Sequence, residues 1–183
     1  MIELTSTPII ILAILGGVGV ALPVISIAMK ERGTVASYGI VTLIALFASI
    51  GYVLYQLALD HVAPAAIFSQ DVLADDAFGS LFAIAMLIVA IFTTVGSFSY
   101  MKNKANPSVY FSLILLSAIG MVLVAYATDL VMLFVAWELM SIPTYILVGF
   151  LKKDPISNEA AIKYFLFGAL SSAIIIYGIS LAY

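Results

Sequence analysis

Six long runs of apolar residues, separated by short polar segments, are the feature that most limits how this chain can fold. They cover residues 8–29, 35–59, 78–101, 107–127, 130–151 and about 160–183. A helix that crosses a hydrocarbon layer of ~30 Å needs about 20 apolar residues, so each run is long enough to span a bilayer. The sequence therefore predicts six transmembrane helices.

The runs are continuously apolar instead of alternating, which excludes a membrane β-barrel and favours helices with internally paired backbones. Of all residues 64% are hydrophobic and 9% are charged, whereas about a quarter of a soluble domain is charged. We expect an all-α, polytopic membrane protein whose residues 1–183 form a single membrane domain. Residues 8–127 supply the first four helices, and residues 128–183 supply the last two.

The charged residues predict the orientation of these helices. All basic residues fall on one side of the six-helix arrangement: Lys30, Arg32, Lys102, Lys104, Lys152, Lys153 and Lys163. The other side carries only acids: Glu3, Asp60, Asp71, Asp75, Asp76 and Asp129. Because basic loops stay in the cytoplasm, both termini are expected on the outer side, as in a multi-pass protein of a prokaryotic plasma membrane.

The same composition excludes several function classes. The net charge is −3, and no basic cluster is longer than Lys152–Lys153, so no surface for nucleic acid is expected. The chain has no cysteine and one histidine, which cannot supply an iron–sulfur cluster or a Cys/His zinc site. Any redox centre is therefore expected on another polypeptide.

Glu138 is the first candidate for chemistry, because it lies deep within the run 130–151. At ~1.5 Å per residue, it is about 13 Å from one edge of that helix and about 21 Å from the other. A carboxylate at that depth costs several kcal/mol unless it is paired, hydrated or protonated. Such groups often serve ion or proton pathways, although a neutral glutamic acid that only holds helices together is the alternative.

A narrow stripe of polar or small residues accompanies Glu138. Ser141, Tyr145 and Gly149 follow it at three, seven and eleven residues, on one face of the helix. Such a stripe can order water, but it is also typical of close contact between membrane helices. Pro143 withholds an amide from the carbonyl one turn earlier, which loosens the backbone beside the acid.

Lys163 is the second candidate, one to two turns into the last helix. Ser157 or Asn158 is expected to cap that helix, with Glu159 in its first turn. The long side chain of Lys163 can either extend outward to the membrane surface or turn inward. Further along, the small residues Gly168, Ser171 and Ser172 are expected to serve helix packing.

Three linked segments in residues 127–183, about a third of the chain, carry a family resemblance. They are the helix sequence WELMSIPTYILVGF, a short basic loop, and NEAAIKYFLFGALSSAIIIYG. This set resembles the antiporter-like subunit N of respiratory complex I, the NADH-quinone oxidoreductase, and of its archaeal and photosynthetic relatives. Residues 1–126 fit the family only as apolar helices.

The resemblance implies a membrane subunit that translocates protons within a larger complex. Electron transfer to quinone elsewhere in that complex supplies the energy. In that family a glutamate on the fifth helix faces a lysine on a broken seventh helix, with a further lysine on the sixth. By motif, Glu138 matches the glutamate and Lys163 matches the last lysine. The resemblance also implies flavin, iron–sulfur clusters and quinone in partner subunits, with no cofactor in this chain, and neighbouring antiporter-like and small membrane subunits as partners.

The seventh-helix lysine has no counterpart in these residues, so we expect a fragment or one half of a split subunit that cannot pump protons alone. Three alternatives remain open. The chain could be a non-conducting scaffold or assembly subunit, or part of a related cation/proton antiporter or membrane-bound hydrogenase. A free-standing small transporter is the weakest, because no internal repeat supplies two alternating halves.

Overall fold

The computed structural model describes residues 6–28, 33–59 and 72–183 of the chain. Within them lie six α-helices, each long and apolar enough to cross a membrane. They are α1 (Thr7–Ala28), α2 (Val35–Ala58), α3 (Ala77–Met101), α4 (Pro107–Tyr126), α5 (Leu130–Val148) and α6 (Pro155–Ala182). The predicted all-α fold with six membrane-spanning helices is confirmed.

The start of α6 is the helix boundary that differs most from the prediction. Asp154, and neither Ser157 nor Asn158, caps α6, because its side chain accepts a hydrogen bond of 3.1 Å from the Ile156 amide. Proline at the first helical position has no amide hydrogen to leave unpaired, so the helix begins earlier than expected, at Pro155. The side chains of the two predicted caps instead donate hydrogen bonds to the preceding segment. Ser157 donates to the Val148 carbonyl of α5 at 2.7 Å, and Asn158 donates to the Lys152 carbonyl of the loop at 3.1 Å.

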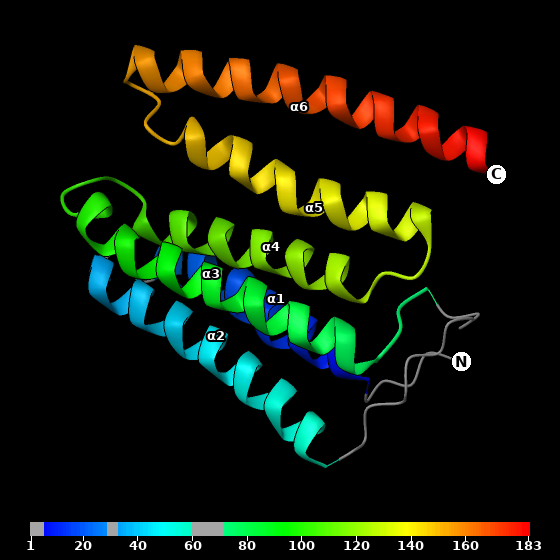
Figure 1. The fold of residues 1–183 in the computed structure, drawn as a ribbon. Helices are drawn as coiled ribbons and strands as arrows, with labels where there is room; N and C mark the ends of the chain where they lie inside the picture. The colour runs from blue at the N-terminus through cyan, green and yellow to red at the C-terminus, as the bar shows by residue number, and fades with distance from the viewer. Residues whose placement is uncertain (1–5, 29–32, 60–71) are drawn as a thin grey trace.

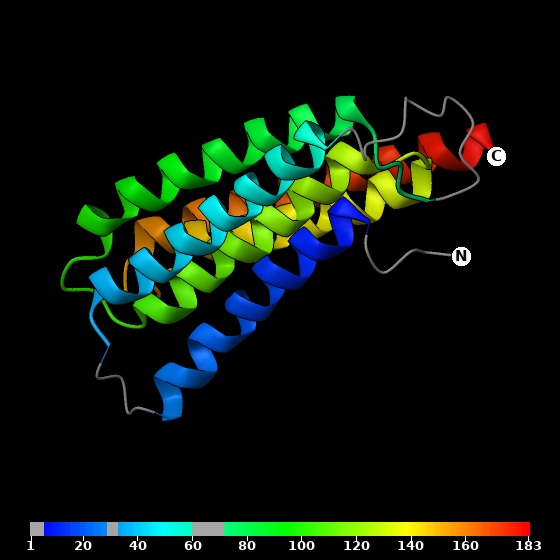
Figure 2. The same ribbon diagram turned by 90° about the horizontal axis from the view of Figure 1, so that it is seen from below.

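Helix α4 is the centre of the bundle. It contacts α1, α2, α3 and α5, and Figure 2 shows α1 and α3 on opposite sides of it. Two close approaches explain this position. Ser112 donates a hydrogen bond to the Gly19 carbonyl of α1, and Gly120 lies against the backbone of α5 at Met140. Small residues of this kind let membrane helices approach closely.

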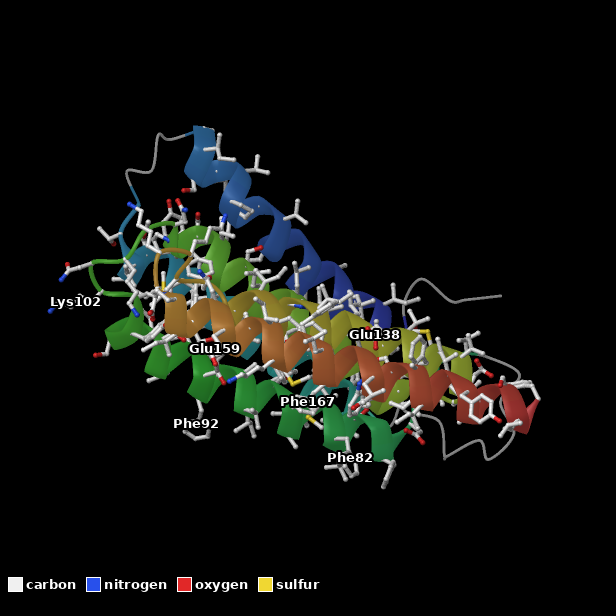
Figure 3. The ribbon with its side chains drawn as sticks, turned by 90° about the horizontal axis from the view of Figure 1, so that it is seen from above. Phe82, Phe92, Lys102, Glu138, Glu159 and Phe167 are labelled. Atoms are coloured by element: carbon white, nitrogen blue, oxygen red, sulfur yellow. The ribbon has the colours of Figure 1, made fainter. Side chains whose placement is uncertain are left out.

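Helix α6 lies at the edge of the bundle. Among the described residues it packs on α5 alone, as Figure 1 shows, and none of its residues is buried. Large apolar side chains point away from the bundle, including Phe167 of α6 and Phe82 and Phe92 of α3 in Figure 3. Such exposed apolar surface is what lipid contact requires, because hydrocarbon is as apolar as a protein core.

The two ends of the bundle differ in charge. At one end, which we call the basic end, the α3–α4 loop and the α5–α6 loop contain Lys102, Lys104, Lys152 and Lys153, together with Asp154. Helix α1 begins and α6 finishes at the opposite, acidic end (Figure 1). Lys30, Arg32, Glu3, Asp60 and Asp71, on which the orientation prediction also rests, lie outside the described residues.

Three aspartates organise the acidic end. Asp75 accepts a hydrogen bond of 2.7 Å from the backbone amide of Thr7, the first residue of α1. Asp76 and Asp129 cap α3 and α5, each accepting hydrogen bonds from amides in the first turn. Negative side chains are favourable at helix N-termini, because they pair with free amides and with the positive end of the helix dipole. The acids therefore stabilise three helix starts.

The close approach at Gly120 gives a direct test of the bundle. In Gly120→Ala, the new Cβ would lie 2.6 Å from the Met140 Cα, so α4 and α5 must separate. Overpacking of this kind costs about 1–3 kcal/mol. Thermal unfolding in detergent should therefore show a lower midpoint for this variant. Gly51→Ala is the control, because nothing lies within 4 Å of its new Cβ; equal midpoints for the two variants would contradict the α4–α5 packing.

Candidate functional site

Glu138 lies at the middle of α5, nine positions after the capping Asp129 in a helix of 19 residues. Its side chain is partly buried and accepts a hydrogen bond from the Ser172 hydroxyl of α6. Figure 3 shows Glu138 beside α6, well along that helix from Glu159. The acid is therefore held between two helices, at a depth where free water is scarce in a membrane.

The contact between α5 and α6, which we call the α5–α6 seam, has a regular antiparallel register. Its contacting pairs are Asp129 with Tyr183, Glu138 with Ser172, Tyr145 with Gly168, and Gly149 with Ala161. As the residue number rises along α5, the residue number of the α6 partner falls by a similar amount, as expected for antiparallel helices. The polar and small stripe predicted on α5 thus mainly faces α6, which supports the helix-contact interpretation of that stripe.

Ser172 is the hydrogen-bond partner of Glu138 that the sequence pattern did not predict. It was expected to serve packing together with Gly168 and Ser171, yet it bonds to the acid. Ser171, its neighbour, donates instead to the Phe167 carbonyl of its own helix at 2.9 Å. The signal that separates the two serines is spacing, since Ser172 lies four residues after Gly168 and therefore on the same helix face.

Tyr145 fills the seam on the basic-end side of Glu138. Its ring packs edge-on against Tyr164, with ring centres 5.0 Å apart, and against Phe165 at 5.7 Å. A Cβ built on Gly168 would lie 2.6 Å from the Tyr145 Cζ, so a larger residue at position 168 would displace this ring. The Tyr145 side chain of α5 thus packs closely against α6.

Ser141 and Pro143 are both buried in α5. The Ser141 hydroxyl donates to the Trp137 carbonyl of its own helix at 2.8 Å. Pro143 has no amide hydrogen, and the next residue, Thr144, donates its hydroxyl to the Ser141 carbonyl at 2.6 Å. The Thr144 hydroxyl also lies 3.4 Å from that of Tyr164 on α6. Hydroxyl groups thus continue along the seam past the proline.

Lys163 is not brought to Glu138. Its Nζ lies 2.5 Å from Oε1 of Glu159, one turn earlier on α6, and both side chains are about two-thirds exposed, at 67% and 66%. Nine residues separate it from Ser172, which is about 13 Å along the helix. Of the two expected orientations, the structure has the side chain on the outside of α6, paired with its own helix.

The seam is also closed at the acidic end. The Tyr183 hydroxyl donates a hydrogen bond to Asp129, the cap of α5. This bond, followed by the one from the Met132 amide, lowers the pKa of Asp129 below its ordinary value. The same bond raises the pKa of Tyr183, because it favours the protonated phenol. In the part of the chain that is described, no group of three His, Cys, Asp or Glu residues could hold a metal ion.

The family model and the relatives described below point to the same family of membrane subunits. The family model described as NADH:quinone oxidoreductase/Mrp antiporter, TM, matches residues 127–183. NADH-quinone oxidoreductase subunit N of Desulfitobacterium hafniense is 38% identical over 187 aligned residues, covering 100% of this chain and 35% of the relative. F(420)H(2) dehydrogenase subunit N of Methanosarcina mazei is 38% identical over 117 residues, covering 64% of this chain and 24% of the relative.

A solved structure agrees with these relatives. A chain of respiratory complex I from Thermus thermophilus, solved with bound aureothin, superposes with a TM-score of 0.74 at 28% sequence identity. The match covers 94% of this chain and 36% of the other. The chain therefore spans about a third of the length of the proteins that it matches over most of its own length.

The register of the α5–α6 seam can be tested by cross-linking. The chain has no cysteine, so a double variant Gly149→Cys/Ala161→Cys carries only the two introduced thiols. A Cβ on Gly149 would approach that of Ala161 to 2.8 Å, and a disulfide needs about 3.5–4.5 Å, so a small helix shift permits the bond. Mild oxidation in membranes should cross-link this pair rapidly.

Gly149→Cys/Ala160→Cys is the matched control, because Ala160 is exposed and points about 100° away around α6. Electrophoresis after limited proteolysis in the α5–α6 loop distinguishes linked from unlinked helices. Equal yields from the two pairs would show that the register is wrong.

Proposed function

Since this chain belongs to the antiporter-like subunit N family of NADH-quinone oxidoreductases, we propose that it contributes part of a proton-conducting path to a redox-driven membrane complex. The observation that carries the proposal is the hydrogen bond between Ser172 and the mid-helix carboxyl of Glu138. An ionisable side chain in the middle of a membrane helix, facing another helix, is usually part of an ion or proton pathway.

The Ser172 hydroxyl is a suitable partner for an acid that gains and loses a proton. A hydroxyl donates one hydrogen bond and also accepts, so it can pair with Glu138 in both states of the carboxyl group. It donates to the carboxylate, and it accepts from the protonated acid. Glu138 can therefore exchange a proton without losing its neighbour, which lowers the cost of the exchange in a water-poor seam.

The hydroxyl groups of Tyr145, Thr144 and Tyr164 lie between the level of Glu138 and the basic end. We propose that they, with water, carry protons along the seam. In the proposal, Lys163 and Glu159 form the basic-end terminus of this part of the path. During turnover, Lys163 would exchange Glu159 for another partner or bind it with a different strength. Ser141 and Pro143 would keep the backbone beside Glu138 accessible to water.

The same proposal gives the orientation of the chain in the membrane and the subunits beside it. The basic end would face the cytoplasm of a prokaryotic cell, and both ends of the chain would face outward. The names of the relatives specify different electron donors, NADH in one and F(420)H(2) in another. Donor, flavin, iron–sulfur clusters and quinone would therefore be bound by partner subunits, with further membrane subunits beside this one.

A complete conduit is proposed for the assembled complex and not for these residues alone, because they span 35% of the first relative. Membrane vesicles that contain only this chain should therefore show no proton conductance that depends on Glu138. A pH-sensitive dye inside the vesicles measures this. A conductance that disappears in Glu138→Gln would contradict this part of the proposal.

A non-conducting scaffold is the alternative function, and the close contacts along the α5–α6 seam favour it. Gly149 and Gly168 let the helices approach, and Glu138 with Ser172 would add a fixed hydrogen bond. In a scaffold the acid serves only to hold α6 in place. Its ability to exchange a proton would then be irrelevant.

Glu138→Gln in the assembled complex separates the two functions. Glutamine keeps the size of the side chain and an oxygen that accepts from Ser172, but it cannot exchange a proton. Proton pumping per electron should fall strongly while the complex still assembles. Dye-monitored proton uptake in sealed vesicles and native gel electrophoresis measure the two properties. Undiminished pumping, with loss of assembly in Glu138→Ala, would favour the scaffold.

Ser172→Ala and Ser171→Ala provide a matched pair of controls. The first removes the hydrogen bond to Glu138, and the second removes a bond within α6 only. Because a hydrogen bond to a charged group is worth about 1.5–3 kcal/mol, Ser172→Ala should slow pumping partially and Ser171→Ala should leave it unchanged. Equal effects would mean that the hydroxyl does not act through the acid.

A further inference from the structure

A cavity of about 810 Å³ opens at the basic end, where Gly149 at the end of the α5–α6 seam is one of its lining residues. The α3–α4 loop with the first turn of α4 forms one wall, and the end of α5 with the α5–α6 loop forms the other. Figure 1 shows both loops at the same end of the bundle. Sites for small molecules typically have about 300–1,000 Å³, so this cavity is large enough to hold one.

The lining of the cavity combines a cationic and an apolar part. Lys104, Lys152 and Lys153 come from the loops and supply three positive charges. The only acid in the lining, Asp154, is engaged in capping α6. Apolar lining residues come from helices α4 and α5, namely Val109 and Ile146, and from the loop beside the lysines, namely Phe150 and Leu151. The formal charge of the lining is therefore +2, next to walls that have the character of the membrane interior.

The three lysines are available for an anion. Within the described ranges, the single ion pair is that of Lys163 with Glu159, on the side of α6. The Nζ of Lys104 lies 3.1 Å above the centre of the Tyr100 ring, which does not neutralise its charge. Lys152 and Lys153 are exposed. Among the described residues, none of the three lysines of the lining is therefore neutralised by an ion pair.

The start of α4 adds to this preference for anions. Asn106 takes a left-handed backbone, with φ at 57°, and its side chain makes no capping hydrogen bond. The positive end of the α4 dipole therefore lacks the side-chain acceptor that α3, α5 and α6 have. Asn106 and Val109 both line the cavity, so the start of α4 borders it; Asn106 and Pro107 also line a second cavity of about 310 Å³. Free helix N-termini of this kind attract phosphate groups.

The walls of the cavity are fixed by aromatic contacts. Tyr100 of α3 packs against Tyr110 of α4 with ring centres 5.9 Å apart, and Tyr110 meets Phe150 edge-on at 5.1 Å. This row connects the loop that carries Lys104 with the loop that carries Lys152 and Lys153. The two loops that carry the lysines are therefore joined by side-chain packing before any ligand binds, which reduces the entropy cost of binding.

We infer that this cavity binds one anionic phospholipid, with its phosphate among Lys104, Lys152 and Lys153 and its acyl chains along Val109 and Ile146. The position supports a lipid over a soluble anion. The lysines lie where the helices end, at headgroup level, and Val109 and Ile146 lie within the membrane-spanning helices α4 and α5. Only an amphipathic anion matches both parts, and basic pockets between membrane helices are known to suit such headgroups.

A bound lipid would connect the α3–α4 loop to the α5–α6 loop. That connection matters for α6, because among the described residues this helix otherwise packs on α5 alone. The inference is independent of the proposed proton path, since the cavity lining contains neither Glu138 nor Lys163.

Native mass spectrometry of the purified chain, with dioleoyl phosphatidylglycerol and dioleoyl phosphatidylcholine as probes, tests the inference. The wild-type chain should bind the anionic lipid more tightly. Each lysine near a headgroup contributes about 1 kcal/mol, which is about fivefold in affinity. Lys104→Gln/Lys152→Gln/Lys153→Gln should therefore lose on the order of a hundredfold. Lys102→Gln is the matched control, because Lys102 is an exposed lysine of the same loop outside the lining.

Two further measurements keep the inference testable if the triple variant does not fold. Raising the salt concentration should weaken binding of phosphatidylglycerol to the wild-type chain and leave phosphatidylcholine unaffected. Glycerol phosphate, which has the anion without the chains, should compete poorly. Equal binding of the two lipids, an equal loss in Lys102→Gln, or full competition by glycerol phosphate would each overturn the inference; the last would indicate a soluble anion as the ligand.

Discussion

A membrane interior offers no water to polar groups, and the hydrogen bonds of this bundle follow from that constraint. The backbone pairs along each helix, and several hydroxyls return to a carbonyl of their own helix, including Thr42, Ser49, Thr94 and Ser141. Others reach a neighbouring helix, as in Ser112 with Gly19, Ser117 with Met140, and Ser172 with Glu138. Because lipid is as apolar as a neighbouring helix, these bonds and the small residues beside them determine the packing.

Among the described residues, burial is greatest in α4 and least in α6. Helix α4 is largely buried, α5 buries only three of its residues, and α6 buries none. Glu138 lies at the junction of α5 and α6, so a polar side chain occupies the part of the bundle with the least apolar burial.

The depth of Glu138 and the limits of the helices could be predicted from the sequence, and most of the helix limits agree within about three residues. The start of α6 was wrong, because Asp154 competes with Ser157 for the capping position and stands directly before a proline. Ser172 was not recognised as the partner of the acid. A serine in a small-residue segment has many packing roles, and spacing along one helix does not give its register against another.

The sequence by itself determined how many helices cross the membrane, roughly where each begins, and how deep the acid lies. These follow from the length of the apolar runs and from a fixed rise per residue. Only the tertiary structure decided which face of each helix meets which neighbour, and hence that Glu138 meets Ser172 while Lys163 pairs with Glu159. The physical reason is that a helix surrounded by lipid is apolar on all sides, so hydropathy does not distinguish the face toward protein from the face toward lipid.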